Sequence, residues 1–178
     1  YKRAAAMVGN ERELAEYSRI VNVLAAGGTV PAQRALLALL GDKEGKTEYQ
    51  RHVALNALGF TKYGAHSDVV DALKHMVFNV FGNQTRQNVA LTDPIAAFAP
   101  VTLATVVHFR HHIGHVDPAE RKRTMELQDA LEKHAQVALV DSHPNEHKLV
   151  WINALGNTGR NSSFPIISQY LQEHRAGK

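Results

Sequence analysis

The stretch Asn56–Thr61 reads NALGFT, and it returns almost unchanged as NALGNT at Asn153–Thr158. A fainter copy, LALLG, occupies Leu37–Gly41. In each copy apolar residues at helical spacing lead to a glycine, and a polar loop and a second apolar segment follow. Such units bury their apolar faces only against neighbouring units. Their repetition therefore predicts a solenoid of helix pairs.

Start and stop signals for helices occur along the whole chain. Thr47 and Gln50 have the spacing of a capping box, as do Asn10 and Glu13, and Asp117–Glu120 combines an N-cap, a first-turn proline and a third-position glutamate. Pro100 predicts a break or bend within an apolar segment. These signals predict about eight helices over residues 10–27, 31–41, 47–59, 67–82, 93–114, 117–140, 145–156 and 162–171.

The predicted fold class is all-α, because no alternating strand pattern interrupts this series. We expect a HEAT- or armadillo-like α-solenoid, a right-handed superhelix of antiparallel helix pairs that forms a single domain over residues 1–178. Within it, Ser67 is expected to cap a helix that ends near Gly82. The polar segment Gly82–Thr92 is the expected long connection.

Composition excludes several classes of protein. No apolar run reaches the roughly 18 residues that a membrane-spanning helix needs. The chain has no cysteine, so it has no disulfide and no thiolate metal site. The formal net charge is only +3, and the one tight basic run, Arg121-Lys122-Arg123, is expected to form a solvated helix face. We therefore expect no nucleic-acid partner.

Two of these stretches resemble the helical domain of the large lipid transfer proteins, the family of vitellogenin, apolipophorin and microsomal triglyceride transfer protein. LAAGGTVPA at Leu24–Ala32 is similar to a turn between helices of that domain, and WINALGNTG at Trp151–Gly159 is similar to its ALGN-G turn. Ser162-Ser163 and the apolar residues after it are also in place, and Ala96–His108 resembles the family's alanine-rich buried helix. The chain departs from the family at His111-His112, where cysteines often follow that helix.

The resemblance implies a non-catalytic role in lipid transport. The chain would be the curved helical wall that braces a lipid cavity formed elsewhere in a longer, secreted protein. Its partners would be other domains or chains of that lipid-carrying protein, and it would contact lipid only indirectly. The alternative is a HEAT-like scaffold for protein–protein interaction.

Histidine is the residue type that could form a metal-binding site in this chain. Of 11 histidines, four lie within two turns, and the i,i+4 pairs His108/His112 and His111/His115 would share one broad helix face. Two imidazoles at this spacing can bind zinc, with a third ligand from another segment such as Asp117. His134 is a second candidate for that ligand. A metal-dependent enzyme is thus a third reading, although no glutamate lies within the motif as a general base. Exposed or hydrogen-bonded histidines are the alternative.

Other constellations have structural interpretations. Asp141-Ser142-His143 is predicted to be a turn, because it lacks the elbow of a hydrolase nucleophile. Gly156–Gly159 lacks the Gly-Lys-Ser/Thr pattern of a phosphate loop. Trp151 and the pair Phe78 and Phe81 are expected in the core. We therefore expect no catalytic residues and no organic cofactor.

Two sequons could carry N-linked glycans. Asn83 and Asn161 each begin an Asn-x-Ser/Thr triplet in a predicted loop. These sequons could be glycosylated only if the protein is secreted, as the resemblance implies.

Overall fold

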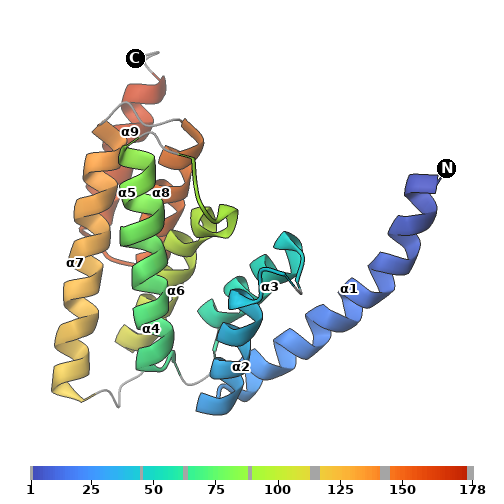
Figure 1. The fold of residues 1–178 in the computed structure, drawn as a ribbon. Helices are drawn as coiled ribbons and strands as arrows, with labels where there is room; N and C mark the ends of the chain where they lie inside the picture. Colours follow the sequence, from blue (N-terminus) through green and yellow to red (C-terminus); the bar gives the residue numbers. More distant parts are fainter. Residues whose placement is uncertain are drawn as a thin grey trace. The chain divides into compact units, whose positions relative to one another are not determined.

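The computed structural model describes residues 2–44, 46–61, 64–87, 90–112, 117–140 and 145–175, and this part of the chain is helical, without a strand (Figure 1). The predicted all-α class is confirmed. The chain divides into two compact units, Tyr1–Val69 and Val70–Lys178. No helix in the described residues is long and apolar enough to span a membrane.

The first unit contains three helices, and each packs against the other two. A left-handed glycine, Gly28 with a φ of 58°, separates the first helix from the second. The side chain of Thr29 accepts a hydrogen bond from the Ala32 amide, and Pro31 lies in the first turn of the second helix as predicted. The helices are α1 (Lys2–Gly27), α2 (Val30–Gly41) and α3 (Glu48–Gly59).

The capping box predicted at Asn10 is wrong. α1 begins at Lys2, so Asn10 and Glu13 lie inside the helix. The residues before Asn10 include Ala4-Ala5-Ala6-Met7, which are strong helix formers and extend the helix toward the N-terminus. The capping box predicted at Thr47 is confirmed, because both of its reciprocal hydrogen bonds with Gln50 are present.

Buried polar side chains tie the first unit together. The Gln33 amide donates to the carbonyls of Gly28 and Gly64, each at 2.9 Å, and its oxygen accepts from the His66 amide at 2.6 Å. Arg51 Nε donates to the Leu40 carbonyl at 2.8 Å, near the C-terminus of α2. A cation at that end also complements the helix dipole. These bonds fix how α3 and the loop after it lie against α2.

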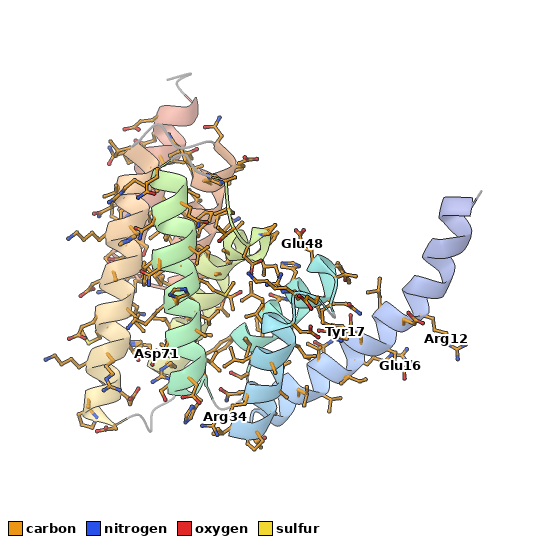
Figure 2. The ribbon with its side chains drawn as sticks, viewed as in Figure 1. Arg12, Glu16, Tyr17, Arg34, Glu48 and Asp71 are labelled. Carbon is orange, nitrogen blue, oxygen red and sulfur yellow. The ribbon has the colours of Figure 1, made fainter. Side chains whose placement is uncertain are left out.

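Tyr17 links α1 to α3. Its hydroxyl donates to the Gln50 carbonyl at 3.0 Å, and burial, together with the nearby Asp42 carboxylate, raises the pKa of the phenol. Figure 2 shows Tyr17 beside α2 and α3, with Arg12 and Glu16 farther along α1. The link lies in the C-terminal half of α1.

A long helical rod crosses the division between the two units. It consists of α4 (Ser67–Lys74), a π-helical segment, η1 (His75–Phe81), and α5 (Gly82–Arg86), which follow one another without a gap. Counted as one, the rod brings the α-helices in the described residues to eight, close to the prediction. α4 begins at Ser67 itself, and the Asp68 amide donates to the ring of the preceding residue, His66, at 3.4 Å.

The predicted helix end at Gly82 is wrong. The Gly82 amide donates to the Val77 carbonyl, five residues back, so the glycine continues the π turn and the helix goes on to Arg86. Thr85 is buried, and its hydroxyl donates to the Phe81 carbonyl at 2.6 Å. The first part of the expected loop over Gly82–Thr92 is therefore helix.

The rest of the second unit is built around α6. Pro100 lies in its first turn, directly after a 3₁₀ segment, so the predicted break at this proline is confirmed. The N-terminus predicted at Asp117–Glu120 is also confirmed, and the Asp117 carboxylate accepts from the Ala119 amide at 3.4 Å. The elements are η2 (Pro94–Phe98), α6 (Ala99–His112), α7 (Pro118–Val140), α8 (Asn145–Thr158) and α9 (Ser163–Arg175).

The core of this unit lies where α6, α7 and α8 meet. Most residues of α6 from Ala99 to Val107 are buried, and α6 packs against both α7 and α8. Trp151 of α8 is 1% exposed and Phe81 is fully buried, as predicted, while Phe78 is partly buried. α9 packs on α8 and α7. The unit therefore places the end of α6 beside the turn between α8 and α9.

Candidate functional site

The two NALG stretches are built alike, one in each unit. Both lie at the end of a helix: α3 of the first unit ends at Gly59, and α8 of the second unit continues two residues past Gly156 to Thr158. In both copies the alanine and leucine are buried and the asparagine is exposed. The threonine at the sixth position is buried in both and donates to the leucine carbonyl three residues earlier: Thr61 to Leu58 at 3.4 Å, and Thr158 to Leu155 at 2.7 Å. The two copies thus share the burial of three residues and one hydrogen bond.

In the second unit this repeat ends against α6. His108 Nδ1 lies 3.2 Å from the carbonyl oxygen of Thr158, and the Asn157 amide donates to the Thr105 hydroxyl at 3.0 Å. The left-handed Gly159 follows, and a Cβ built on it would lie only 2.4 Å from His108 Nδ1. The turn between α8 and α9 therefore fits closely around the His108 ring.

The structure brings together part of the predicted histidine cluster. His108 and His112 lie on one face of α6 with ring centroids 4.5 Å apart, and His111 lies 5.5 Å from His112. His111 and His112 are exposed, and His108 is half-buried. His115 lies outside the described residues. The i,i+4 pair His108/His112 is therefore formed.

The proposed third ligands are not brought to this pair. Within the described residues there is no group of three histidine, aspartate or glutamate side chains placed to hold a metal ion. His134 packs instead against Phe78 and Trp151, and the Asp117 carboxylate caps α7. The described part of the chain thus offers two imidazoles and not three ligands.

Sequence reasoning missed the environment of His134. Its ring meets Phe78 of the π segment edge to face, with centroids 4.7 Å apart, and lies 6.2 Å from the Trp151 ring. Burial and the positive charges of Arg86 and Lys133 lower its pKa, partly offset by a backbone hydrogen bond to Ala130. The position of His134 in the apolar stripe of α7, with Leu131 and Ala138, indicates that its side chain faces the core, but does not identify Phe78 and Trp151 as its neighbours.

Exposed apolar side chains gather on the outer helices of the second unit. Phe164 and Leu171 of α9 are 71% and 47% exposed, and Val140 at the end of α7 is 87% exposed. A groove of about 160 Å³ runs between these two helices and is lined in part by Ile166 and Tyr170. This surface has the character of a contact face.

The other predicted features have mixed outcomes. Arg121, Lys122 and Arg123 are all exposed, so the basic run is the solvated face that the sequence predicted. Asn161 lies in an exposed turn, but Asn83 lies in α5, so the loop predicted for it is wrong, although its side chain is exposed. The triplet Asp141-Ser142-His143 lies outside the described residues.

No model of a known protein family matches the chain, and searches of curated proteins and of solved structures found no significant match.

Proposed function

We propose that this chain is a non-catalytic helical support domain of a vitellogenin-like lipid-transport protein, arranged as a HEAT-like solenoid. It would brace a lipid cavity that other domains form, in a secreted protein. The observation that carries the proposal is the repeated helix end, because NALGFT and NALGNT share a buried alanine, leucine and threonine and the same threonine hydrogen bond. A solenoid requires such repeated units.

A second support comes from the apolar residues at the two outermost helices of the chain. Ile20 and Val23 of α1 are 55% and 70% exposed, and Phe164 and Leu171 are exposed on α9. Each repeat of a solenoid buries such faces against its neighbour. Exposed apolar positions on α1 and α9 fit a segment of a longer array, and Tyr49, Met125 and Leu149 are exposed on other helices as well.

The proposal assigns no reaction to the chain. The described residues hold no group of three histidine, aspartate or glutamate side chains at the histidine pair, and the sequence lacks the motifs of a hydrolase nucleophile and of a phosphate loop. The function then rests on packing against other domains or chains of the same protein. Lipid contact would be indirect.

The test uses the parent protein. An antibody against the 178-residue chain should precipitate, from its natural source, a protein that releases phospholipid or acylglycerol on solvent extraction. The isolated chain, loaded with the same lipids and recovered on a sizing column, should retain none, because the cavity is formed elsewhere. A lipid-free precipitate would contradict the proposal.

A protein-interaction scaffold is the second candidate, and the groove between α7 and α9 favours it. The groove combines apolar Leu139 and Ile166 with polar Gln136 and Gln169, a mixture typical of transient protein interfaces. A lipid-free precipitate that holds a second protein in constant ratio would support this candidate. Substitution of Ile166 by aspartate should then release that partner.

A further inference from the structure

We propose that His108 and His112 form a two-imidazole site for a divalent transition metal ion, binding Cu²⁺ more tightly than Ni²⁺ or Zn²⁺. The site lies at the C-terminal end of α6 and is independent of the proposed role in lipid transport. The described residues offer no third protein ligand, so water would fill the remaining positions of the metal.

The environment of His108 determines which ring nitrogen is available. Nδ1 faces the Thr158 carbonyl at 3.2 Å, and a carbonyl oxygen only accepts hydrogen bonds. The proton of the neutral ring is therefore on Nδ1, and Nε2 carries the lone pair that a metal needs. Histidine ligands of metals are commonly oriented in this way, by a carbonyl that accepts from the other ring nitrogen.

The separation of the two rings fits a shared ion. Metal–nitrogen bonds to histidine are about 2.0–2.1 Å long, which puts each ring centroid about 3 Å from the metal. Two imidazoles at roughly a right angle around one ion then have centroids about 4.5 Å apart. The centroids of His108 and His112 are 4.5 Å apart in an edge contact, with the ring planes inclined by 62°, so a shared ion would need both rings to turn their Nε2 atoms toward it. Near-right angles between neighbouring ligands are typical of tetragonal Cu²⁺ and Ni²⁺.

The local electrostatics also favour a cation. His112 lies in the last described turn of α6 and His108 lies one turn earlier, so the pair is near the negative end of the helix dipole. Arg110, a cationic side chain in the last turn of α6, forms an ion pair with Glu120 of α7, which offsets its charge. Affinity for imidazole sites follows the order in which Cu²⁺ exceeds Ni²⁺ and Zn²⁺.

Titration of the untagged 178-residue chain with Cu²⁺, in a buffer with a weak competing chelator, tests the site. One equivalent should bind more tightly than any other in the wild-type chain. His112→Ala should weaken that equivalent about tenfold or more, and His108→Gln, which keeps most of the ring's volume, should do the same. The double variant measures background binding by the remaining histidines.

His111→Ala is the matched control, since His111 is the exposed neighbour of His112 on the same turn. It should change Cu²⁺ affinity by no more than about twofold. An equal loss in His111→Ala and His112→Ala would overturn the assignment of ligands. A wild-type titration indistinguishable from that of the double variant would overturn the site itself.

Two further measurements separate ligation from a general structural effect. Nitrogen-15 NMR of the imidazoles should show His108 protonated at Nδ1 without metal, and added Zn²⁺ should shift Nε2 of His108; protonation at Nε2 would contradict the proposal. Gly159→Ala, which crowds the His108 ring without removing a ligand, should weaken Cu²⁺ binding about tenfold. Unchanged affinity in this variant, with the helical circular dichroism intact, would show that the contact with the α8–α9 turn does not orient the ligand.

Discussion

Gly159 is the residue with the least freedom to change in the second unit. Its φ of +66° is a conformation that side chains with a Cβ rarely adopt, and the added atom would collide with the His108 ring. Gly156, three residues earlier, lies inside α8, and a Cβ there would meet nothing within 4 Å. Substitution by alanine should therefore be tolerated at Gly156 and not at Gly159.

Gly159→Ala should lower the free energy of unfolding by about 1–3 kcal/mol, the cost of a strained backbone conformation. Gly156→Ala should be neutral or stabilising by up to about 1 kcal/mol, since alanine favours helix more than glycine does. Denaturant titration followed by the fluorescence of Trp151, the single tryptophan of the chain, measures both. Equal losses in the two variants would contradict the role of the positive φ.

Trp151 is a core residue, so Trp151→Ala should cost about 3–5 kcal/mol. The indole Nε1 has no hydrogen-bond partner among the described residues, so Trp151→Phe removes an unpaired buried donor and should cost less. Phe164→Ala, at a 71% exposed aromatic residue of α9, is the control and should stay within about 0.5 kcal/mol. Circular dichroism during urea titration gives all three values, and a small loss for Trp151→Ala would place the indole at a surface.

Single residues differ in how far the sequence determines them. The burial of Trp151 follows from helical spacing, because its apolar neighbours in α8 repeat at three and four residues. The environment of His134 depends on the rotation of α7 against the π segment. That rotation is set by packing over a sequence separation of more than fifty residues, which no local pattern records.

The sequence predicts a helix boundary correctly where a side chain caps the backbone. It predicts the boundary poorly where the helix continues past a residue that usually ends helices. Thr47 and Asp117 mark their helices because their oxygens accept from amides that would otherwise lack partners. Gly82 looks like a stop, yet its amide bonds to Val77 and the rod continues. A π turn adds one residue to a turn of the helix, and it is stabilised by tertiary packing. The local amino-acid composition therefore does not predict it.

The Thr47 cap should contribute measurably to α3. Thr47→Ala removes the acceptor for the Gln50 amide and one half of the capping box, so the expected loss is about 1 kcal/mol. Ser67→Ala is the matched control, because α4 begins at Ser67 itself and the hydroxyl lies 3.5 Å from the His66 ring; its loss should be below about 0.5 kcal/mol. Thermal unfolding by circular dichroism compares them, and equal losses would mean that the capping box contributes nothing specific.

The contact between α7 and the π segment should make stability depend on pH. Because the folded protein lowers the pKa of His134 below its ordinary value of 6.5, the unfolded chain takes up a proton first as pH falls. The stability that the neutral His134 ring contributes to the folded protein is therefore fully present above about pH 6.5. It falls as the pH drops below that value, and it stops falling below the pKa of His134 in the folded protein.

Urea titrations at pH 7.5, 6.5, 5.5 and 4.5 in EDTA, followed by Trp151 fluorescence, measure the effect. His134→Phe keeps an aromatic ring against Phe78 and should flatten the pH dependence. His111→Gln, at an exposed histidine of α6, should leave it unchanged. If the free energy of unfolding of His134→Phe changes with pH as steeply as that of the wild-type protein, other titratable groups cause the pH dependence.

At the scale of the whole molecule, the sequence predicted the all-helical class that the described residues show. Both NALG ends place a buried leucine and a buried threonine alike, although ninety-seven residues separate them. Repetition is visible in sequence because each unit obeys the same local rules. A partner that covered an outer helix face would belong to other sequence, so it would leave no pattern in this chain.

The exposed apolar residues of α9 should become covered in the parent protein, if the chain is one segment of a longer helical array. Packing of a further element over Phe164 and Leu171 would raise the free energy needed to open α9, and would slow exchange of its backbone amides. Hydrogen–deuterium exchange with mass spectrometry, on the isolated chain and on the immunoprecipitated parent, compares the two directly. α6, whose residues are mostly buried within the second unit itself, is the internal reference and should exchange alike in both samples. If α9 also exchanges alike in both, its apolar face has no partner in the parent, and the support role proposed for this helix is wrong.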